Sequence, residues 1–159
     1  MIRTTLAGDR DWLARLDAMP GRVRAEVGAA VAGLGAALQA EVRNNRLSGQ
    51  VLAARSGRLR DSVAVETSDA PDRLAASVSA TAPYAAIQEF GGVTAPHEIR
   101  LRRAQALAFM LGGRLVFARC VRHPGSRLPE RSFLRSALAD MAPGIRAGIG
   151  AAVARAVTP

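Results

Sequence analysis

The chain has 159 residues and a formal net charge of +9, and its 22 basic residues are all arginine. This length is sufficient for a domain that buries a core without disulfide or metal staples, and the single cysteine, Cys120, excludes an internal disulfide. The first residues lack the apolar segment of a signal peptide, and no run approaches the roughly 18 apolar residues of a membrane span. We therefore expect a soluble, unprocessed protein without a membrane partner, whose cysteine content suits a reducing cytosol.

The positive charge is concentrated in the second half of the chain. Residues 97–135 contain nine arginines and two acids, Glu98 and Glu130, a local excess of seven positive charges. Such a surface attracts phosphate or an acidic protein. The alternative is a solvated strand face that keeps the protein soluble.

Residues 9–43 are predicted to be helical. Asp9 can cap a first short helix, Pro20-Gly21 is expected to interrupt it, and a main helix then runs over residues 22–43. One apolar stripe steps along this helix by three or four residues: Val23, Val27, Val31, Leu34, Leu38 and Val42. Three glycines would let another backbone approach closely, although genetic drift explains them equally well: Gly28, Gly33 and Gly35.

The middle of the chain changes from helical to strand patterns. Residues 44–61 have no clear periodicity and are expected to form a flexible loop that a partner orders. Two alternating runs, 63–67 and 74–80, predict a hairpin with its turn at 68–72. Pro83 then opens a short helix over 83–90, which Gly91-Gly92 ends.

A second strand pair follows in the basic region. Residues 97–103 and 107–121 contain apolar runs, and Gly112-Gly113 between two of them indicates a hairpin. C-terminal helices are predicted within residues 130–157, with a break at Pro143. The sequence thus predicts an α+β protein, a single domain over residues 1–159: a long N-terminal helix packed on a small antiparallel sheet of about four strands within 62–121, then the C-terminal helices.

Chemical motifs are few. Cys120-x-x-His123 has a metal-like spacing that His97 could join, but a zinc site needs further ligands, so a buried thiol beside a loop histidine is favoured. Glu89 and Glu98 lack the third acid or suitably spaced histidine that a metal-dependent nuclease needs. With aromatics at 4%, there is no stacking platform for single-stranded nucleic acid. We expect no enzyme, no metal and no cofactor.

Three blocks of sequence, in a fixed order, carry a family resemblance. They are residues 56–62 before a strand, residues 83–92 with Pro-Tyr-Ala and Glu-Phe-Gly-Gly, and residues 128–138. Together they resemble the signature blocks of tailed-phage virion-morphogenesis proteins, the head–tail joining or tail-completion family to which the minor tail protein Z of lambda is distantly similar. The likeness spans residues 20–142 and departs from the pattern at Ser56, commonly threonine, and at Ser132, commonly proline.

This resemblance implies a structural virion protein, assembled in the host cytoplasm, that forms a hexameric ring in the neck between head and tail of a siphophage, a prophage or a gene transfer agent. Its implied partners are copies of itself and other neck and tail proteins: the connector or stopper, the tail terminator and the tail tube. Nonspecific contact with DNA in the channel is also implied. The alternatives are a tail terminator of the same neck and a basic nucleic-acid-binding accessory protein.

Candidate contact residues follow from the same resemblance. Apolar anchors buried between subunits supply most of the free energy of association in such assemblies. The residues predicted at the subunit interface are Tyr84, Phe90, Arg58, Leu59, Arg131 and Phe133. The alternative for the three aromatics is the monomer's own core, which is preferred for Phe133. The residues predicted to face DNA or an acidic partner are Arg100, Arg102, Arg103, Arg114 and Arg119.

Overall fold

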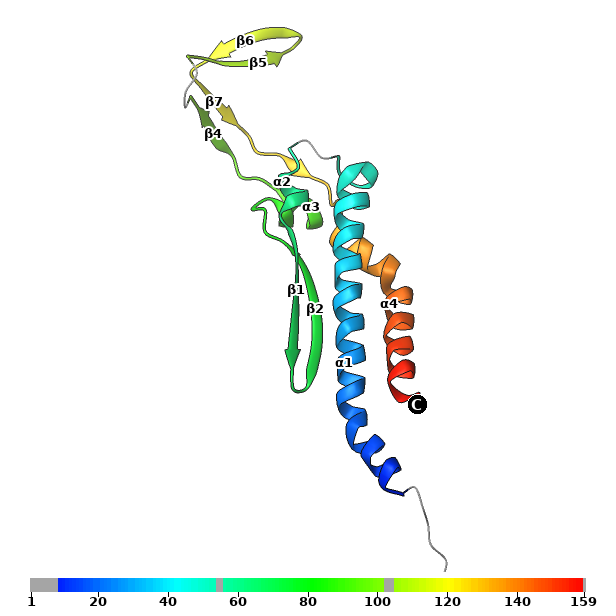
Figure 1. Ribbon diagram of the computed structural model, residues 1–159. Coiled ribbons are helices and arrows are strands. Elements are labelled where there is room, and N and C mark those ends of the chain that lie inside the picture. Colours follow the sequence, from blue (N-terminus) through cyan, green and yellow to red (C-terminus); the bar gives the residue numbers. More distant parts are fainter. Residues whose placement is uncertain (1–8, 54–55, 102–104, 159) are drawn as a thin grey trace, which may run out of the picture. The chain divides into compact units, whose positions relative to one another are not determined.

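The computed structural model describes residues 9–53, 56–101 and 105–158, with side chains from residue 14 onward. The chain divides into two compact units: unit 1 comprises residues 1–85 and 132–159, and unit 2 comprises residues 86–131 (Figure 1). The α+β class is confirmed, because long helices and short antiparallel strands both occur. The prediction of a single domain over residues 1–159 stays a prediction.

Unit 1 contains two long helices, and both run through a proline. α1 (Asp9–Glu41) includes Pro20, and α4 (Leu134–Val157) includes Pro143, so the predicted breaks at these positions are wrong. A proline inside a helix leaves one carbonyl without its N–H partner. Both prolines are exposed, so water can replace the lost bond. Neither helix, nor any other in the described ranges, combines the length and apolarity needed to cross a membrane.

The prediction of a continuous flexible loop over residues 44–61 is wrong, because residues 44–50 lie in a π-helical segment and residues 58–61 in a short helix. The first helix continues as the π-helical segment η1 (Val42–Gln50), which bends where Ser48 and Gly49 leave helical geometry, Gly49 with a φ of +126°. Leu47 of this segment is buried. This apolar contact anchors η1, although the sequence of the segment has no periodic apolar pattern. After the undescribed residues 54 and 55, the short helix α2 (Arg58–Asp61) follows.

The strands β1 (Val63–Ala70) and β2 (Arg73–Ala80) form a hairpin whose ladder runs from Val63–Ala80 to Ala70–Arg73. The turn is therefore shorter than predicted and consists of Pro71 and Asp72. The hairpin packs on α1, as expected of the long helix. The contact is tightest at Gly35, where an added Cβ would meet the Cβ of Ala76 at 2.7 Å.

α4 packs antiparallel to α1. Asp140 near the start of α4 binds Arg46 at 2.6 Å, and Arg155 near its end binds Glu26 at 3.3 Å. Arg46 also binds Glu41 at 3.2 Å. The hydrogen bond that Arg46 donates to Asp140, with a second one to Glu41, raises the pKa of Arg46 above its ordinary value. This guanidinium is therefore a fixed positive charge between η1 and α4.

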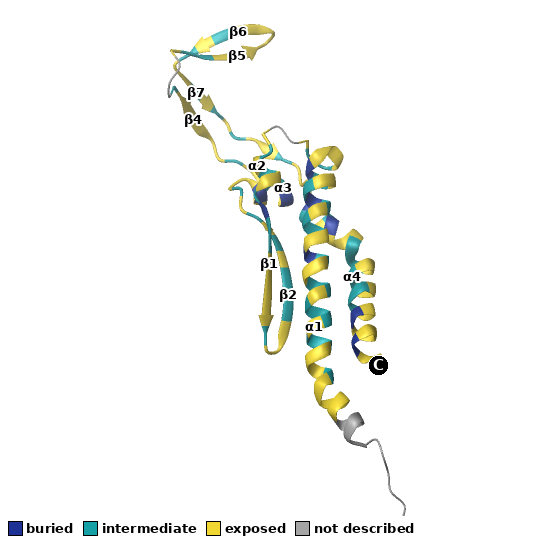
Figure 2. Ribbon diagram, in the orientation of Figure 1, coloured by how far each residue is buried: buried dark blue, intermediate teal, exposed yellow. Residues whose placement is uncertain are grey.

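The apolar core of unit 1 lies where η1, β1 and the start of α4 meet (Figure 2). Phe133, at the N-terminus of α4, is its largest fully buried side chain. Leu38, Leu59 and Val78 are half-buried and pack against this cluster. The other buried members of the cluster are Val42, Leu47, Val63, Ala85 and Ala137.

Unit 2 is a series of nested two-stranded antiparallel ladders. β3 (Gly92–Val93) pairs with β8 (Arg127–Leu128), β4 (His97–Arg100) with β7 (Cys120–His123), and β5 (Leu107–Leu111) with β6 (Arg114–Ala118). With β1–β2, the described strands thus form four separate ladders in place of one four-stranded sheet. The predicted Gly112-Gly113 hairpin is confirmed: both glycines have positive φ, +57° and +78°, as a two-residue turn between β5 and β6 requires.

Two other glycines hold the base of unit 2 together. At Gly91 (φ +70°) a Cβ would meet the backbone nitrogen of Glu130 at 2.7 Å, and at Gly125 (φ +90°) it would meet the carbonyl oxygen of Thr94 at 2.2 Å. Both positions combine a left-handed backbone with close approach of a second strand, which only glycine tolerates. The glycine ending the helix α3 (Ala85–Phe90) is thus also a packing residue.

Candidate assembly surfaces

Two of the predicted interface residues line one small cleft of unit 1. Arg58, from α2, and Tyr84 border a cavity of about 210 Å³. It forms beside the β1–β2 ladder, where the backbone N–H of Thr81 donates to the carbonyl of Ser62 at 3.2 Å. The structure therefore brings the first and second sequence blocks together, and Tyr84 keeps 38% of its surface exposed.

Leu59 and Phe133 lie in the core of unit 1 and not at the cleft. Phe133 is 0% exposed and Leu59 packs half-buried against the same core. Their side chains hold unit 1 together, which is the alternative preferred for Phe133 from the sequence. The third block thus supplies a core anchor at the start of α4.

Phe90 and Arg131 lie at the base of unit 2. Phe90, the last residue of α3, is 60% exposed, and Arg131 is exposed while its backbone N–H donates to the carbonyl of Gln88 at 2.9 Å. The second and third blocks are therefore neighbours through their backbones. Glu89, in the second block, is buried. It lies one helical turn after Ala85, which is also buried.

The arginines of the predicted basic surface fall into two groups, those bound to an acidic side chain and those without an ion pair among the described residues. Arg100 binds Glu98 at 2.6 Å, and Glu98 also receives Arg122 at 3.4 Å. Arg114 and Arg119 are exposed and form no ion pair with any other residue that the structure describes. Arg102 and Arg103 lie outside the described residues.

Cys120, His97 and His123 do not form one metal-binding cluster among the described residues. Cys120 and His123 are three residues apart on β7, so their side chains point to opposite faces, and Cys120 is exposed, not buried as expected. His123 belongs to the strand, and its ring stacks on His97 of β4 with centroids 5.0 Å apart. Nδ1 of His123 accepts the N–H of Gly125 at 3.1 Å, so the pair stabilises the β4–β7 ladder.

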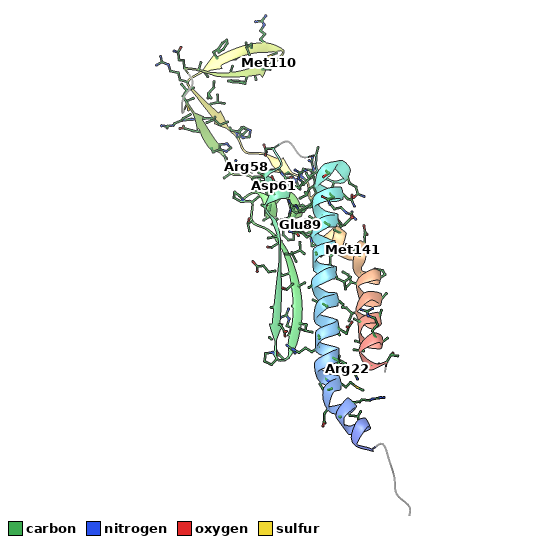
Figure 3. All side chains as sticks on the ribbon, viewed as in Figure 1. Arg22, Arg58, Asp61, Glu89, Met110 and Met141 are labelled. Carbon is green, nitrogen blue, oxygen red and sulfur yellow. The ribbon has the colours of Figure 1, made fainter. Side chains whose placement is uncertain are left out.

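Sequence reasoning missed two apolar surfaces. The first is the tip of the β5–β6 hairpin, where four large apolar side chains are each more than half exposed: Met110, Leu111, Leu115 and Phe117. Figure 3 shows the Met110 side chain projecting from the strands. The signal was present in the two runs Leu107–Leu111 and Arg114–Ala118, which are apolar almost throughout instead of alternating.

The second surface is an open groove along α1, with a volume of about 740 Å³. The predicted apolar stripe of the helix forms its floor, the β1–β2 turn one wall, and Ile149 of α4 another. We call it the α1 groove and define it by Leu16, Met19, Val23, Val27, Val31 and Leu74. A smaller cavity of about 290 Å³ shares Val31, Leu74 and Ile149 and continues it along the helix.

The first half of the chain matches a family of phage proteins. Residues 10–91, slightly more than half of the chain, match the family described as "Bacteriophage HK97-gp10, putative tail-component". The chain belongs to this HK97-gp10-like family. It is therefore a tailed-phage structural component of the tail or neck, found in the virion. No curated protein and no solved structure gives a significant match.

The HK97-gp10-like match covers α1, η1, α2, the β1–β2 hairpin and α3. It includes the first sequence block, all but the last residue of the second, and most of the α1 groove. The free arginines and the exposed hairpin tip lie beyond it. The family assignment thus rests on unit 1 and the start of unit 2.

Proposed function

We propose that this chain is a tail-completion subunit, similar to the lambda minor tail protein Z family, that forms a hexameric ring at the head–tail joint. The observation that carries the proposal is membership in a family of phage tail components. The order of the three sequence blocks, of which two meet at the Arg58–Tyr84 cleft, supports the finer assignment.

The exposed surfaces supply contacts for such a ring. Tyr84 and Phe90 are aromatic side chains that the chain leaves partly uncovered, and aromatic residues with arginine are the typical anchors of protein interfaces. We propose that these residues, with Arg58 and Arg131, contact an adjacent subunit or a neighbouring neck protein. The proposed partners are the connector or stopper, the tail terminator and the tail tube.

The experiment is to locate the protein in intact particles. Antibody or tag density is expected at the junction of head and tail, and particles made without the protein are expected to accumulate as separate heads and tails. Label along the tail tube, or normal joined particles without the protein, would contradict the proposal. Label on the last ring of the tail alone would favour a tail terminator.

A second candidate, contact with DNA, rests on the free Arg114 and Arg119. Phosphate binding through arginine releases counterions, so its affinity falls steeply as salt rises from about 50 to 200 mM. A titration of duplex DNA at both salt concentrations tests this function. Affinity that is absent at low salt would remove it.

A further inference from the structure

The hairpin tip and the α1 groove are two apolar surfaces that their own units leave open. An isolated two-stranded hairpin is at best marginally stable in water, and contiguous exposed apolar patches mark interaction sites. On the hairpin, Met110, Leu115 and Phe117 are exposed on one face and Leu111 on the other. The groove offers a concave apolar floor. The projecting hairpin and the open groove are therefore complementary in shape.

We propose that the β5–β6 hairpin of one copy docks in the α1 groove of a second copy of this chain. Tip and groove are different surfaces, so the contact is heterologous, and repeating it joins subunits head to tail into a ring if the rotation closes. The inference rests on the proposed ring function and names the contact that builds the ring.

Charge favours this pairing over a contact between two hairpins. Arg114 begins the strand β6 and Arg119 directly follows it. Neither has an ion-pair partner among the described residues, so two tips brought together would place like charges side by side. Asp72, in the wall of the groove, likewise forms no ion pair with any described residue. Arg24 in that wall is already bound by Asp69, so Asp72 is an open partner for Arg114.

The chemistry of the tip also favours a protein over DNA. Phosphate contacts require arginine and polar groups, whereas the tip exposes Phe117 and Leu115 between its charges. The groove has the complementary lining, with apolar side chains along most of its length. Burial of the apolar side chains would supply the affinity of the contact. The ion pair between Arg114 and Asp72 would fix its orientation.

The test uses two variants of the full chain, each of which disables one surface. Phe117→Asp places a charge on the tip, and the double variant Leu16→Asp/Met19→Asp places charges in the groove. Wild-type protein is expected to show a mass that rises with concentration in sedimentation velocity. Each variant alone is expected to associate at least about tenfold more weakly.

Mixing the two variants gives the decisive result. The groove variant has an intact tip and the tip variant has an intact groove, so one contact is possible, and the mixture is expected to form a 1:1 dimer and nothing larger. Val93→Asp in unit 2 and Val157→Asp in unit 1 are matched controls. Both residues are exposed apolar side chains outside the two surfaces, and both variants are expected to associate like wild type.

Several results would overturn the docking. They are a monomeric wild type at every concentration, a mixture that stays monomeric, or a groove variant that still pairs with itself. Loss of duplex DNA binding in Phe117→Asp with self-association retained would assign the tip to nucleic acid. Circular dichroism of each variant confirms its fold. Because location in particles is measured separately, failed docking with label at the junction would remove this contact and leave the proposed function in place.

Discussion

Unit 1 and unit 2 both contain antiparallel hairpins, but different forces hold them. In unit 1 the β1–β2 ladder lies on α1, and every fully buried apolar side chain among the described residues belongs to this unit. In unit 2 the ladders are set by backbone hydrogen bonds, positive-φ glycines and a histidine stack. Burial defines the first unit, whereas turn geometry defines the second and leaves several of its large apolar side chains exposed.

The largest effect expected from this comparison comes from one phenylalanine in each unit. Phe133→Ala opens a cavity in the core of unit 1 and should lower the free energy of unfolding by about 3–5 kcal/mol. Phe117→Ala removes a side chain that is 65% exposed and should cost less than about 1 kcal/mol in the isolated chain. Urea unfolding followed by circular dichroism measures both. Equal losses would mean that unit 2 has a core of its own.

Two glycines of α1 sharpen the comparison within unit 1. Gly35→Ala pushes a methyl group against Ala76 and Val65 of the hairpin and should destabilise the protein by about 1–3 kcal/mol through overpacking. Gly33 has no atom within 4 Å of an added Cβ, so Gly33→Ala should stabilise the helix by up to about 1 kcal/mol. Thermal unfolding of the two variants should therefore shift in opposite directions. Shifts of the same sign would contradict the tight helix–hairpin contact.

The smallest effects compare ion pairs of the two units. Arg46→Gln removes a side chain that is 11% exposed and bound to two acids, and should cost roughly 1–2 kcal/mol. Arg100→Gln removes a side chain that is 76% exposed and should cost less than about 0.5 kcal/mol. Denaturant unfolding at low and high salt measures both, and salt should reduce the second effect more.

The sign of the pH dependence follows from the raised pKa of Arg46. A cation with a folded pKa above its unfolded value stabilises the protein below the unfolded pKa and loses this effect only as pH rises through the folded one. For Arg46 that window lies above the ordinary pKa of arginine, which is already strongly alkaline. The difference between wild type and Arg46→Gln should therefore be unchanged by arginine titration between about pH 7 and 9, and a difference that shrinks there would contradict it.

The sequence predicted those parts of the fold that follow from local patterns. The stripe of α1, the β1–β2 hairpin and the Gly112-Gly113 turn all have a repeat or a turn signal, and all occur. Pro20 and Pro143 misled the prediction because a helix tolerates proline when the freed carbonyl faces water. The strand predicted at 97–103 occurs as β4. The pairings β3–β8 and β4–β7 were not predicted, because they join residues roughly 20 to 36 positions apart that share no local pattern.

The candidate surfaces were predictable only in part. Tyr84 and Phe90 were named from the sequence blocks, but their exposure depends on neighbours that no local pattern specifies. The α1 groove was missed because an apolar stripe looks the same whether a sheet covers it fully or leaves one side open. Burial of Glu89 was missed for the same reason: it is a property of tertiary packing.

The exposed thiol of Cys120 offers a way to follow unit 2 during assembly. Because it is the one cysteine in the sequence and lies on β7, a maleimide fluorophore would label unit 2 at a single defined position without any substitution. Its anisotropy and quenching would then report on the environment of these ladders while subunits are added, and the native protein would serve as its own sensor of assembly.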